Sequence, residues 1–320
     1  MSINHIQFQR GLSLPQFIER FGSEQQCEDA LAAARWPSGW RCAHCNCTRF
    51  FHTHSNTGRK LWECFLCGYQ SSSLVSTVFE HTKLPLTTWF LAMYLMTQSK
   101  NAVSALELKR QLGVNYKTAW LIKHKLLRVM ELRDEPYKLG GRVEIDDAYL
   151  GGERAGSCNG GRGAMNKSAF VAAVQTCPQG KPLFMRLKLI SGFTIAAFKD
   201  WAVENLQSCA HVVSDGTACF RYVTEMGATH ERYVTGSGRA GAQHPSFKWV
   251  NTMLGNLKTA ISGTYHSIDH SKYGNRYLAE FSYRFNRRFD LASLLPRLLN
   301  AAATTKPHTL RTLRGSEACG

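Results

Sequence analysis

The chain has 320 residues, 44% of them hydrophobic, and carries 39 Lys and Arg against 23 Asp and Glu. This length allows two or three domains with sizeable cores, and the composition excludes a predominantly disordered chain. The formal net charge of +16 and a pI near 9.5 indicate a polyanionic partner, with nucleic acid favoured over an anionic membrane. Long apolar runs and a signal-peptide pattern are missing, which predicts a cytoplasmic protein without a membrane partner.

The first 75 residues contain two regions with different sequence patterns. Residues 13–35 carry two short helical patterns that lead into the turn RWPSGW. Residues 41–75 have short apolar runs separated by polar turns, which predict small β-hairpins. A helical segment followed by a small β region is therefore expected.

Two CxxC pairs lie in that β region, Cys42 with Cys45 and Cys64 with Cys67. Four thiolates at this spacing can close a tetrahedron around Zn²⁺, and so short a segment needs the metal in order to fold. A cytoplasmic protein does not use its 11 cysteines as a disulfide framework. The four cysteines predict a zinc ribbon with structural Zn²⁺ rather than a redox-active CxxC.

Helical periodicity returns at residues 85–97 and 102–131. The second stretch divides into two helices around Gly113, Val114 and Asn115, which is a helix-turn-helix pattern that a plain helical bundle would also produce. Residues 101–133 hold seven Lys and Arg against two Glu. The residues expected to contact DNA phosphates are Lys117, Lys123, Lys125 and Arg128.

The remaining chain alternates strands and helices. Strands are expected at residues 142–150, 169–176, 183–190 and 210–214, and helices at 194–206, 246–261 and 269–289. A Gly-rich basic loop at 151–167 separates the first two strands. Three strands, a helix, a strand and a helix predict a mixed α/β sheet of the ribonuclease H type.

Carboxylates stand on two of these strands. Side-chain alternation puts Glu144 and Asp146 on one face of the first strand and Asp147 on the other. Asp215 ends the apolar strand Val212-Val213-Ser214 and precedes a glycine. An Asp at a strand end is often a turn former, but paired carboxylates also bind the two Mg²⁺ ions of phosphodiester chemistry.

These motifs together carry a resemblance. The segments FIERF, RWPSGW, CAHC, CFLC, VEIDDAYLGG, VVSDG, FKWVNTMLGNLK, GTYH and YLAEFSYRFNRR follow one another over nearly the whole chain. The chain resembles bacterial insertion-sequence transposases that couple an N-terminal zinc ribbon to a DDE-type catalytic domain. This resemblance implies hydrolysis at a transposon end, followed by attack of the freed 3′ hydroxyl on target DNA. It implies Asp146 and Asp215 as ligands of catalytic Mg²⁺ or Mn²⁺.

The third ligand departs from the usual DDE pattern. The position of the usual Glu corresponds to Asn251, with Lys258 two helical turns later on the same helix face. Some members of the resembling family have the same Asp, Asp, Asn, Lys set, in which Asn offers a carbonyl oxygen to a metal and Lys an ammonium to a phosphate. Possible replacement ligands are Glu144, Asp147, Glu225 and Glu280.

The last predicted helix repeats aromatic residues every four positions, which is more typical of a core stripe than of a base-stacking surface. Three arginines on it, Arg284, Arg287 and Arg288, are then expected to face DNA. The multidomain arrangement expected is an N-terminal helical segment (1–40), the zinc ribbon (41–75), the helix-turn-helix region (76–138), the catalytic domain (139–290) and a basic C-terminal tail (291–320).

Three functions fit this sequence. A transposase would bind double-stranded DNA at transposon ends and target, as a homo-oligomer that holds two ends together. A catalytically inactive, transposase-derived DNA-binding regulator is the first alternative, favoured by the unusual third ligand. A nuclease that cuts DNA without strand transfer is the second.

Overall fold

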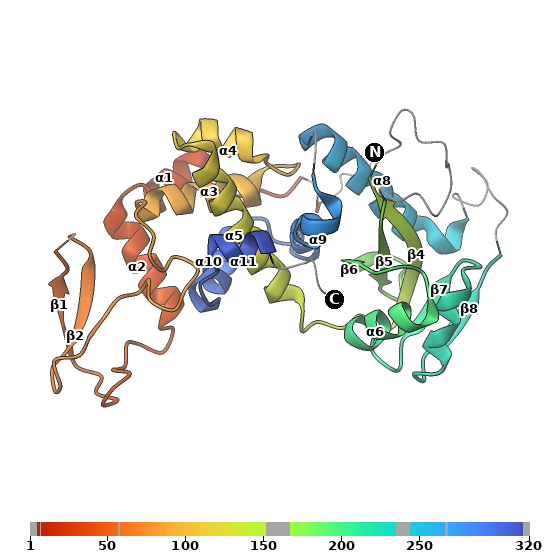
Figure 1. The fold of residues 1–320 in the computed structure, drawn as a ribbon, viewed down its shortest axis with the longest axis horizontal. Coiled ribbons are helices and arrows are strands. Elements are labelled where there is room, and N and C mark those ends of the chain that lie inside the picture. The colour runs from red at the N-terminus through yellow and green to blue at the C-terminus, as the bar shows by residue number, and fades with distance from the viewer. Residues whose placement is uncertain are drawn as a thin grey trace. The chain divides into compact units, whose positions relative to one another are not determined.

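The computed structural model describes residues 5–6, 8–56, 58–151, 167–234, 244–265 and 268–315. The Gly-rich loop predicted at 151–167 therefore lies almost entirely outside the described residues. The chain forms two compact units, one made by Met1–Val129 with Phe289–Leu313 and the other by Met130–Arg288 with Arg314–Gly320 (Figure 1). Among the described residues, no helix has both the length and the apolar character that crossing a membrane requires.

Unit 1 is mainly helical. Ser13 and Ser23 each cap the helix that follows with a complete capping box, which explains why two short helices form where one longer helix could have run. Gly113, in the left-handed region at φ 65°, ends one helix directly before the next begins at Tyr116. The helices are α1 Leu14–Phe21, α2 Glu24–Arg35, α3 Leu86–Gln98, α4 Ala105–Leu112, α5 Tyr116–Asp134, α10 Leu294–Thr304 and α11 Leu310–Gly315. The end of α5, from Met130 on, belongs to unit 2.

Helix α5 is far more buried than its charge pattern suggests. Every residue from Ile122 to Leu127 is buried, including three basic ones. Such burial on all sides marks a central helix rather than a surface helix. Its N-terminal residues Tyr116 and Lys117 remain exposed.

The predicted C-terminal tail instead contributes to unit 1. Helix α10 buries Leu294, Leu295, Leu298 and Leu299 and packs against α2 and α3. The Arg35 guanidinium of α2 donates to the backbone oxygen of Ala303 at 3.0 Å. Because an apolar stripe of this kind needs a partner, Leu294–Thr304 is a structural helix and not part of a solvated basic tail.

A small three-stranded antiparallel sheet follows α2, in the order β1-β2-β3. Its strands are β1 Phe50–His54, β2 Lys60–Cys64 and β3 Gln70–Ser71. Trp40 and Trp62 pack with Cys42 and Cys64 in its interior, and the Trp40 indole donates to Ser71 Oγ. Two tryptophans are a small core, so the sheet depends on the cysteine cluster beside it.

Unit 2 is built on a five-stranded mixed sheet in the order β6-β5-β4-β7-β8. Antiparallel pairing joins β4, β5 and β6, whereas β7 pairs parallel to β4 and β8 pairs parallel to β7. The strands are β4 Arg142–Leu150, β5 Ser168–Thr176, β6 Pro182–Leu189, β7 His211–Ser214 and β8 Thr229–Arg232. The sequence predicted the first four to within about a residue at each end but missed β8, which is short and polar.

Helices cover both faces of this sheet (Figure 1). Alternation along β5 turns Val171 and Ala173 toward α6 and Phe170 and Ala172 toward α8 and α9. The covering elements are α6 Ile195–Asn205, the 3-10 helices η1 Ala218–Thr224 and η2 Pro245–Phe247, α8 Lys248–Thr264 and α9 His270–Asn286. The β4 strand, buried on both faces, is the centre of the unit.

Candidate functional site

The two CxxC pairs close on one another. Sγ of Cys42 lies 3.6 Å from Sγ of Cys67, and Sγ of Cys45 lies 3.4 Å from Sγ of Cys64. All four sulfur atoms are within 4.8 Å of one another. Four sulfurs bound to one Zn²⁺ at about 2.3 Å stand about 3.8 Å apart, so the cluster fits a structural tetrahedral site.

Both CxxC turns are built alike. The N–H of Asn46 donates to the Cys42 oxygen, and the N–H of Gly68 donates to the Cys64 oxygen. Both donors have positive φ, 60° for Asn46 and 69° for Gly68. Asn and Gly tolerate this conformation at low cost, which allows each pair of thiols to turn toward the same point.

A second cluster unites Asp146, Asp147 and Asp215. Each offers a carboxylate oxygen, and these oxygens lie within 4.8 Å of one another. Strands β4 and β7 are paired up to Ile145 and Ser214, where β7 ends. Since β7 does not continue beside β4 past this point, whereas β5 still pairs with the other edge of β4, carboxylates from both faces of β4 can meet Asp215 at the edge that β7 leaves.

Thr217 holds two of these carboxylates. Its hydroxyl lies 3.0 Å from Oδ1 of Asp147 and 3.2 Å from Oδ2 of Asp215, and its N–H donates to Oδ1 of Asp215 at 3.0 Å. The sequence argument missed Thr217, although its position directly after Asp215-Gly216 is typical of an Asp-initiated turn. The site thus has an internal brace that fixes the spacing of its acids.

Burial, and after it the neighbouring carboxylates of Asp147 and Asp215, raise the pKa of Asp146 to about 7. The Lys258 ammonium acts in the opposite direction. Crowded carboxylates in a partly buried place repel one another and favour a bound proton or cation. A divalent cation therefore fits the charge of this cluster.

Helix α8 brings the other two predicted catalytic residues to the same part of unit 2. Asn251 is the fourth residue of α8 and is half-buried, and Lys258 is exposed two turns later. The helix packs on the face of the sheet to which Ala148 and Leu150 of β4 belong. Lys258 is close enough to Asp146 to influence its pKa.

Of the four replacement ligands, the described part of the chain puts Asp147 alone in the acidic cluster. Glu144 is buried and bound to Arg142 and to the start of α8. Glu280 is buried and accepts a hydrogen bond from the Tyr265 hydroxyl at 2.8 Å. Glu225 is exposed at the end of η1.

Two predicted DNA contacts are wrong as they stand. Lys123 is 0% exposed and Lys125 is 8% exposed. Their ammonium groups donate to the backbone oxygens of Val103 and Val78, at 2.7 and 2.9 Å. A buried ammonium needs such acceptors, so these lysines stabilise unit 1 and do not face DNA phosphates. Lys117 is exposed, and Arg128 is half-buried.

The arginines at the end of α9 and directly after it are also engaged within unit 2. Arg287 pairs with Asp134 at 2.5 Å and lies over the Tyr283 ring. Arg288 donates to the backbone oxygens of Pro182 and Leu183 and lies over Phe285. Burial lowers the pKa of Arg284. These contacts correct the prediction that Arg287 and Arg288 face DNA, because their guanidinium groups bind their own unit.

Comparison with known proteins agrees with both clusters. Residues 138–286 match the ISXO2-like transposase domain, and residues 22–70 match the transposase zinc-ribbon domain. An "Uncharacterized protein in transposable element ISH50" from Halobacterium salinarum is 32% identical over 133 residues. That similarity covers 42% of this chain and 44% of the relative, less than half of either protein.

A cysteine cluster in a ribbon and an acidic cluster in a mixed sheet define a metal-binding protein of the transposase class. In chain order, the molecule carries a transposase zinc-ribbon domain and an ISXO2-like transposase domain.

Proposed function

We propose that the chain is an active DNA transposase that cuts insertion-sequence ends and joins them to target DNA. The observation that carries the proposal is the acidic cluster of Asp146, Asp147 and Asp215 at the end of β7, within the region that matches the transposase domain. The sheet order β6-β5-β4-β7-β8, with three antiparallel and two parallel strands, supports a ribonuclease H-like fold.

Each group in the site has a role that suits phosphoryl transfer. Asp146 and Asp215 would hold divalent cations, Mg²⁺ or Mn²⁺, which activate the attacking oxygen and stabilise the leaving oxygen when bound. Lys258, exposed on α8, would bind a DNA phosphate. Thr217 keeps Asp215 and Asp147 at a fixed spacing. Hydrolysis and strand transfer are both in-line reactions, so one site can serve both.

The DNA-contacting surface of unit 1 is proposed at the turn between α4 and α5. Lys109, Arg110 and Lys117 are exposed there, and the N-terminal end of the second helix is the part that enters the major groove in helix-turn-helix proteins. This choice replaces Lys123 and Lys125, whose ammonium groups are buried. Two DNA ends must be held together, which calls for a homo-oligomer on DNA.

One assay separates the transposase from both alternatives. Purified chain with Mg²⁺ and DNA carrying the element's ends should give cut and joined products, and Asp146→Ala or Asp215→Ala should abolish cutting while retaining DNA binding. An inactive regulator would bind without cutting, and a simple nuclease would cut without joining. Full cutting activity in either Asp variant would show that the catalytic site lies at other residues.

Titrating Mg²⁺ in the same assay assigns the third ligand, which we propose to be Asn251. Asn251→Ala should raise the Mg²⁺ midpoint, and Asn251→Glu should restore it by supplying an anionic oxygen. Asp147→Asn tests Asp147, the alternative third ligand that lies within the acidic cluster. Lys258→Ala is the control, since losing a phosphate contact should raise the DNA requirement and leave the Mg²⁺ midpoint in place. A midpoint that follows Asp147 and ignores Asn251 would reverse the assignment.

A further inference from the structure

Helix α8 carries Asn251 and Lys258, but its N-terminal end has no cap of the ordinary kind. Its N-cap residue Phe247 makes no side-chain hydrogen bond to the helix. By contrast, Thr194 caps α6 and Asp269 caps α9 from the position directly before each helix. The first N–H groups of a helix have no partner inside the helix and need an acceptor when buried. For α8, the acceptor comes from the sheet.

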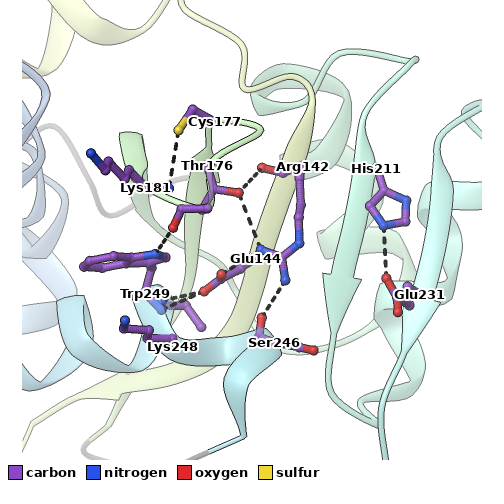
Figure 2. Close-up of polar contacts among 12 residues, drawn as sticks. Arg142, Glu144, Thr176, Cys177, Lys181, His211, Glu231, Ser246, Lys248 and Trp249 are labelled. Atoms are coloured by element: carbon purple, nitrogen blue, oxygen red, sulfur yellow. Dashed lines mark hydrogen bonds and ion pairs between the residues drawn. The ribbon is translucent and has the colours of Figure 1, made fainter.

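Glu144 of β4 is that acceptor (Figure 2). Its Oε2 atom accepts from the backbone N–H of Trp249 at 2.8 Å and from that of Val250 at 3.0 Å. The side chain is only 1% exposed. A carboxylate at a helix N-terminus is also favoured by the helix dipole, and burial strengthens this attraction. The first turn of α8 is therefore tied to the central strand.

Arg142 completes what we name the β4–α8 clamp, made of Arg142, Glu144, Ser246 and Trp249. The Arg142 guanidinium donates to Oε1 of Glu144 at 2.7 Å and to the backbone oxygen of Ser246 at 3.0 Å (Figure 2). The Trp249 indole donates to the Gly180 oxygen, in the turn between β5 and β6, at 2.6 Å. The start of α8 is thus bound to the sheet at two separate places.

The clamp connects the two elements of the acidic site. Asp146 stands two residues after Glu144 on β4, and Asn251 directly follows the two capped residues on α8. We propose that Glu144 is a positioning residue, which fixes α8 so that Asn251 and Lys258 keep their places opposite the carboxylates. This inference rests on the proposed function, and it gives Glu144 no contact with DNA or with a cation.

The contacts of Glu144 argue against a ligand role for it. Oε1 is engaged by Arg142, and Oε2 by two N–H groups, so binding a cation would break the clamp. Small displacements matter in such a site, because a misplacement of about 1 Å can slow catalysis by about 10²-fold.

The test uses the full chain with three changes. Glu144→Ala removes the cap. Glu144→Gln keeps an oxygen that can accept from the helix N–H groups. Its amide N–H₂ group, however, would face the Arg142 guanidinium, and two donors cannot form a hydrogen bond with each other. Adding Arg142→Gln to Glu144→Gln supplies an acceptor there and should restore the cap. Glu204→Ala, which breaks the surface ion pair with Lys188, is the matched control.

Amide hydrogen exchange measures the cap without any activity. Glu144→Ala should speed exchange at Trp249 and Val250 by about tenfold, the effect expected for losing a helix cap. The double variant should exchange as the wild type does, and amides of β5 should be unchanged in every variant. Unchanged exchange at the start of α8 in Glu144→Ala would overturn the proposal.

Mn²⁺ added alone reports where the helix lies. Relaxation of the Asn251 and Lys258 amide signals by bound Mn²⁺ should weaken in Glu144→Ala, while the number of ions bound stays the same. Loss of a bound ion in Glu144→Gln would make Glu144 a ligand, contrary to the proposal. This measurement still tests the positioning role of Glu144 if the wild-type chain cuts no DNA. That outcome would contradict the proposed function but not the clamp.

Single-turnover cutting completes the test. Glu144→Ala should cut about 10²-fold more slowly with end binding retained, and the double variant should recover most of the rate. Glu204→Ala should cut at the wild-type rate. Faster exchange at Trp249 and Val250 with an unchanged cutting rate would show a cap that does not position the site, and the proposal would be wrong.

Discussion

The zinc ribbon and the acidic site both gather metal ligands, but in opposite ways. In the ribbon, Cys42 to Cys67 span a short stretch with a core of two tryptophans, so ligands and fold depend on each other. In unit 2, Asp146 and Asp215 come from strands β4 and β7, which pack within cores on both faces of the sheet. There the fold exists first and imposes the carboxylate cluster.

The free energy that brings the ligands together therefore has different sources in the two regions: metal binding in the ribbon, and folding of the sheet in unit 2. A ribbon without metal has little else to hold it, so metal binding free energy is folding free energy. The sheet instead holds its carboxylates together against their mutual repulsion, and burial together with this repulsion raises the pKa of Asp146. Removing a ligand should consequently have opposite effects on stability in the two regions.

The largest effect is expected in the ribbon. Cys64→Ser should remove about one equivalent of zinc and unfold the ribbon, because three thiolates cannot close the tetrahedral site. The acidic site should still bind Mn²⁺, since unit 2 has its own core. Zinc content measured together with hydrogen exchange in β1 and β2 checks this. An exchange pattern in Cys64→Ser equal to that of the wild type would show that the fold of the ribbon is independent of the metal.

In unit 2, removing a charge should stabilise the metal-free protein. The pKa of Asp146 in the folded state, about 7, lies above its ordinary value of 3.8. Folding therefore favours the protonated acid, and this stabilisation is lost as pH rises from the ordinary pKa through the folded one. With a chelator present, Asp146→Asn should raise the urea midpoint at about pH 8, and the gain should disappear near pH 4.

The surface variant Asp200→Asn, on α6, is the control for that comparison, because its carboxylate is exposed. It should leave the midpoint unchanged at both pH values. A lower midpoint for Asp146→Asn at the higher pH would mean that Asp146 is stabilised as the anion, and the contrast with the ribbon would then fail.

Much of this arrangement follows from local patterns. The CxxC spacing predicted the cysteine cluster, and the alternation of apolar residues predicted β4, β5, β6 and β7 closely. Alternation correctly put Asp147 on the face opposite Asp146, but it gave no sign that the two carboxylates would lie in one cluster. The end of β7 lets both reach Asp215, and where one strand ends beside another is a property of the whole sheet.

The burial of charged residues was the other feature that could not be predicted from the sequence. Lys123 and Lys125 lie in a segment rich in Lys and Arg, which suggested a DNA-binding helix, but α5 is buried at this point within its own unit. Their long side chains reach the backbone oxygens of Val103 and Val78, which lie far away in the sequence. Such acceptors are set by tertiary packing, so a charge pattern cannot separate a buried lysine from a DNA-facing one.

The smallest effect is expected for DNA binding at the α4–α5 turn. Replacing Lys109, Arg110 and Lys117 together with Ala should flatten the slope of log affinity against log salt by about 2.7 units, near 0.9 for each lost phosphate contact. The ribbon zinc and the acidic site should be unaffected. Lys199→Ala, an exposed lysine on α6, should keep the wild-type slope. If the slope for the triple variant equals that of the wild type, DNA binds at a surface other than the α4–α5 turn.

Helix α10 gives the chain a particular order of assembly during synthesis. Its leucines cover α2 and α3, yet they leave the ribosome after residues 130–288 of unit 2 have been made. Unit 1 therefore cannot be completed on a chain that stops within residues 130–288. A prematurely terminated product would lack this cover and expose the apolar faces of α2 and α3. We therefore expect a truncated chain to aggregate rather than to compete for DNA as a free binding domain.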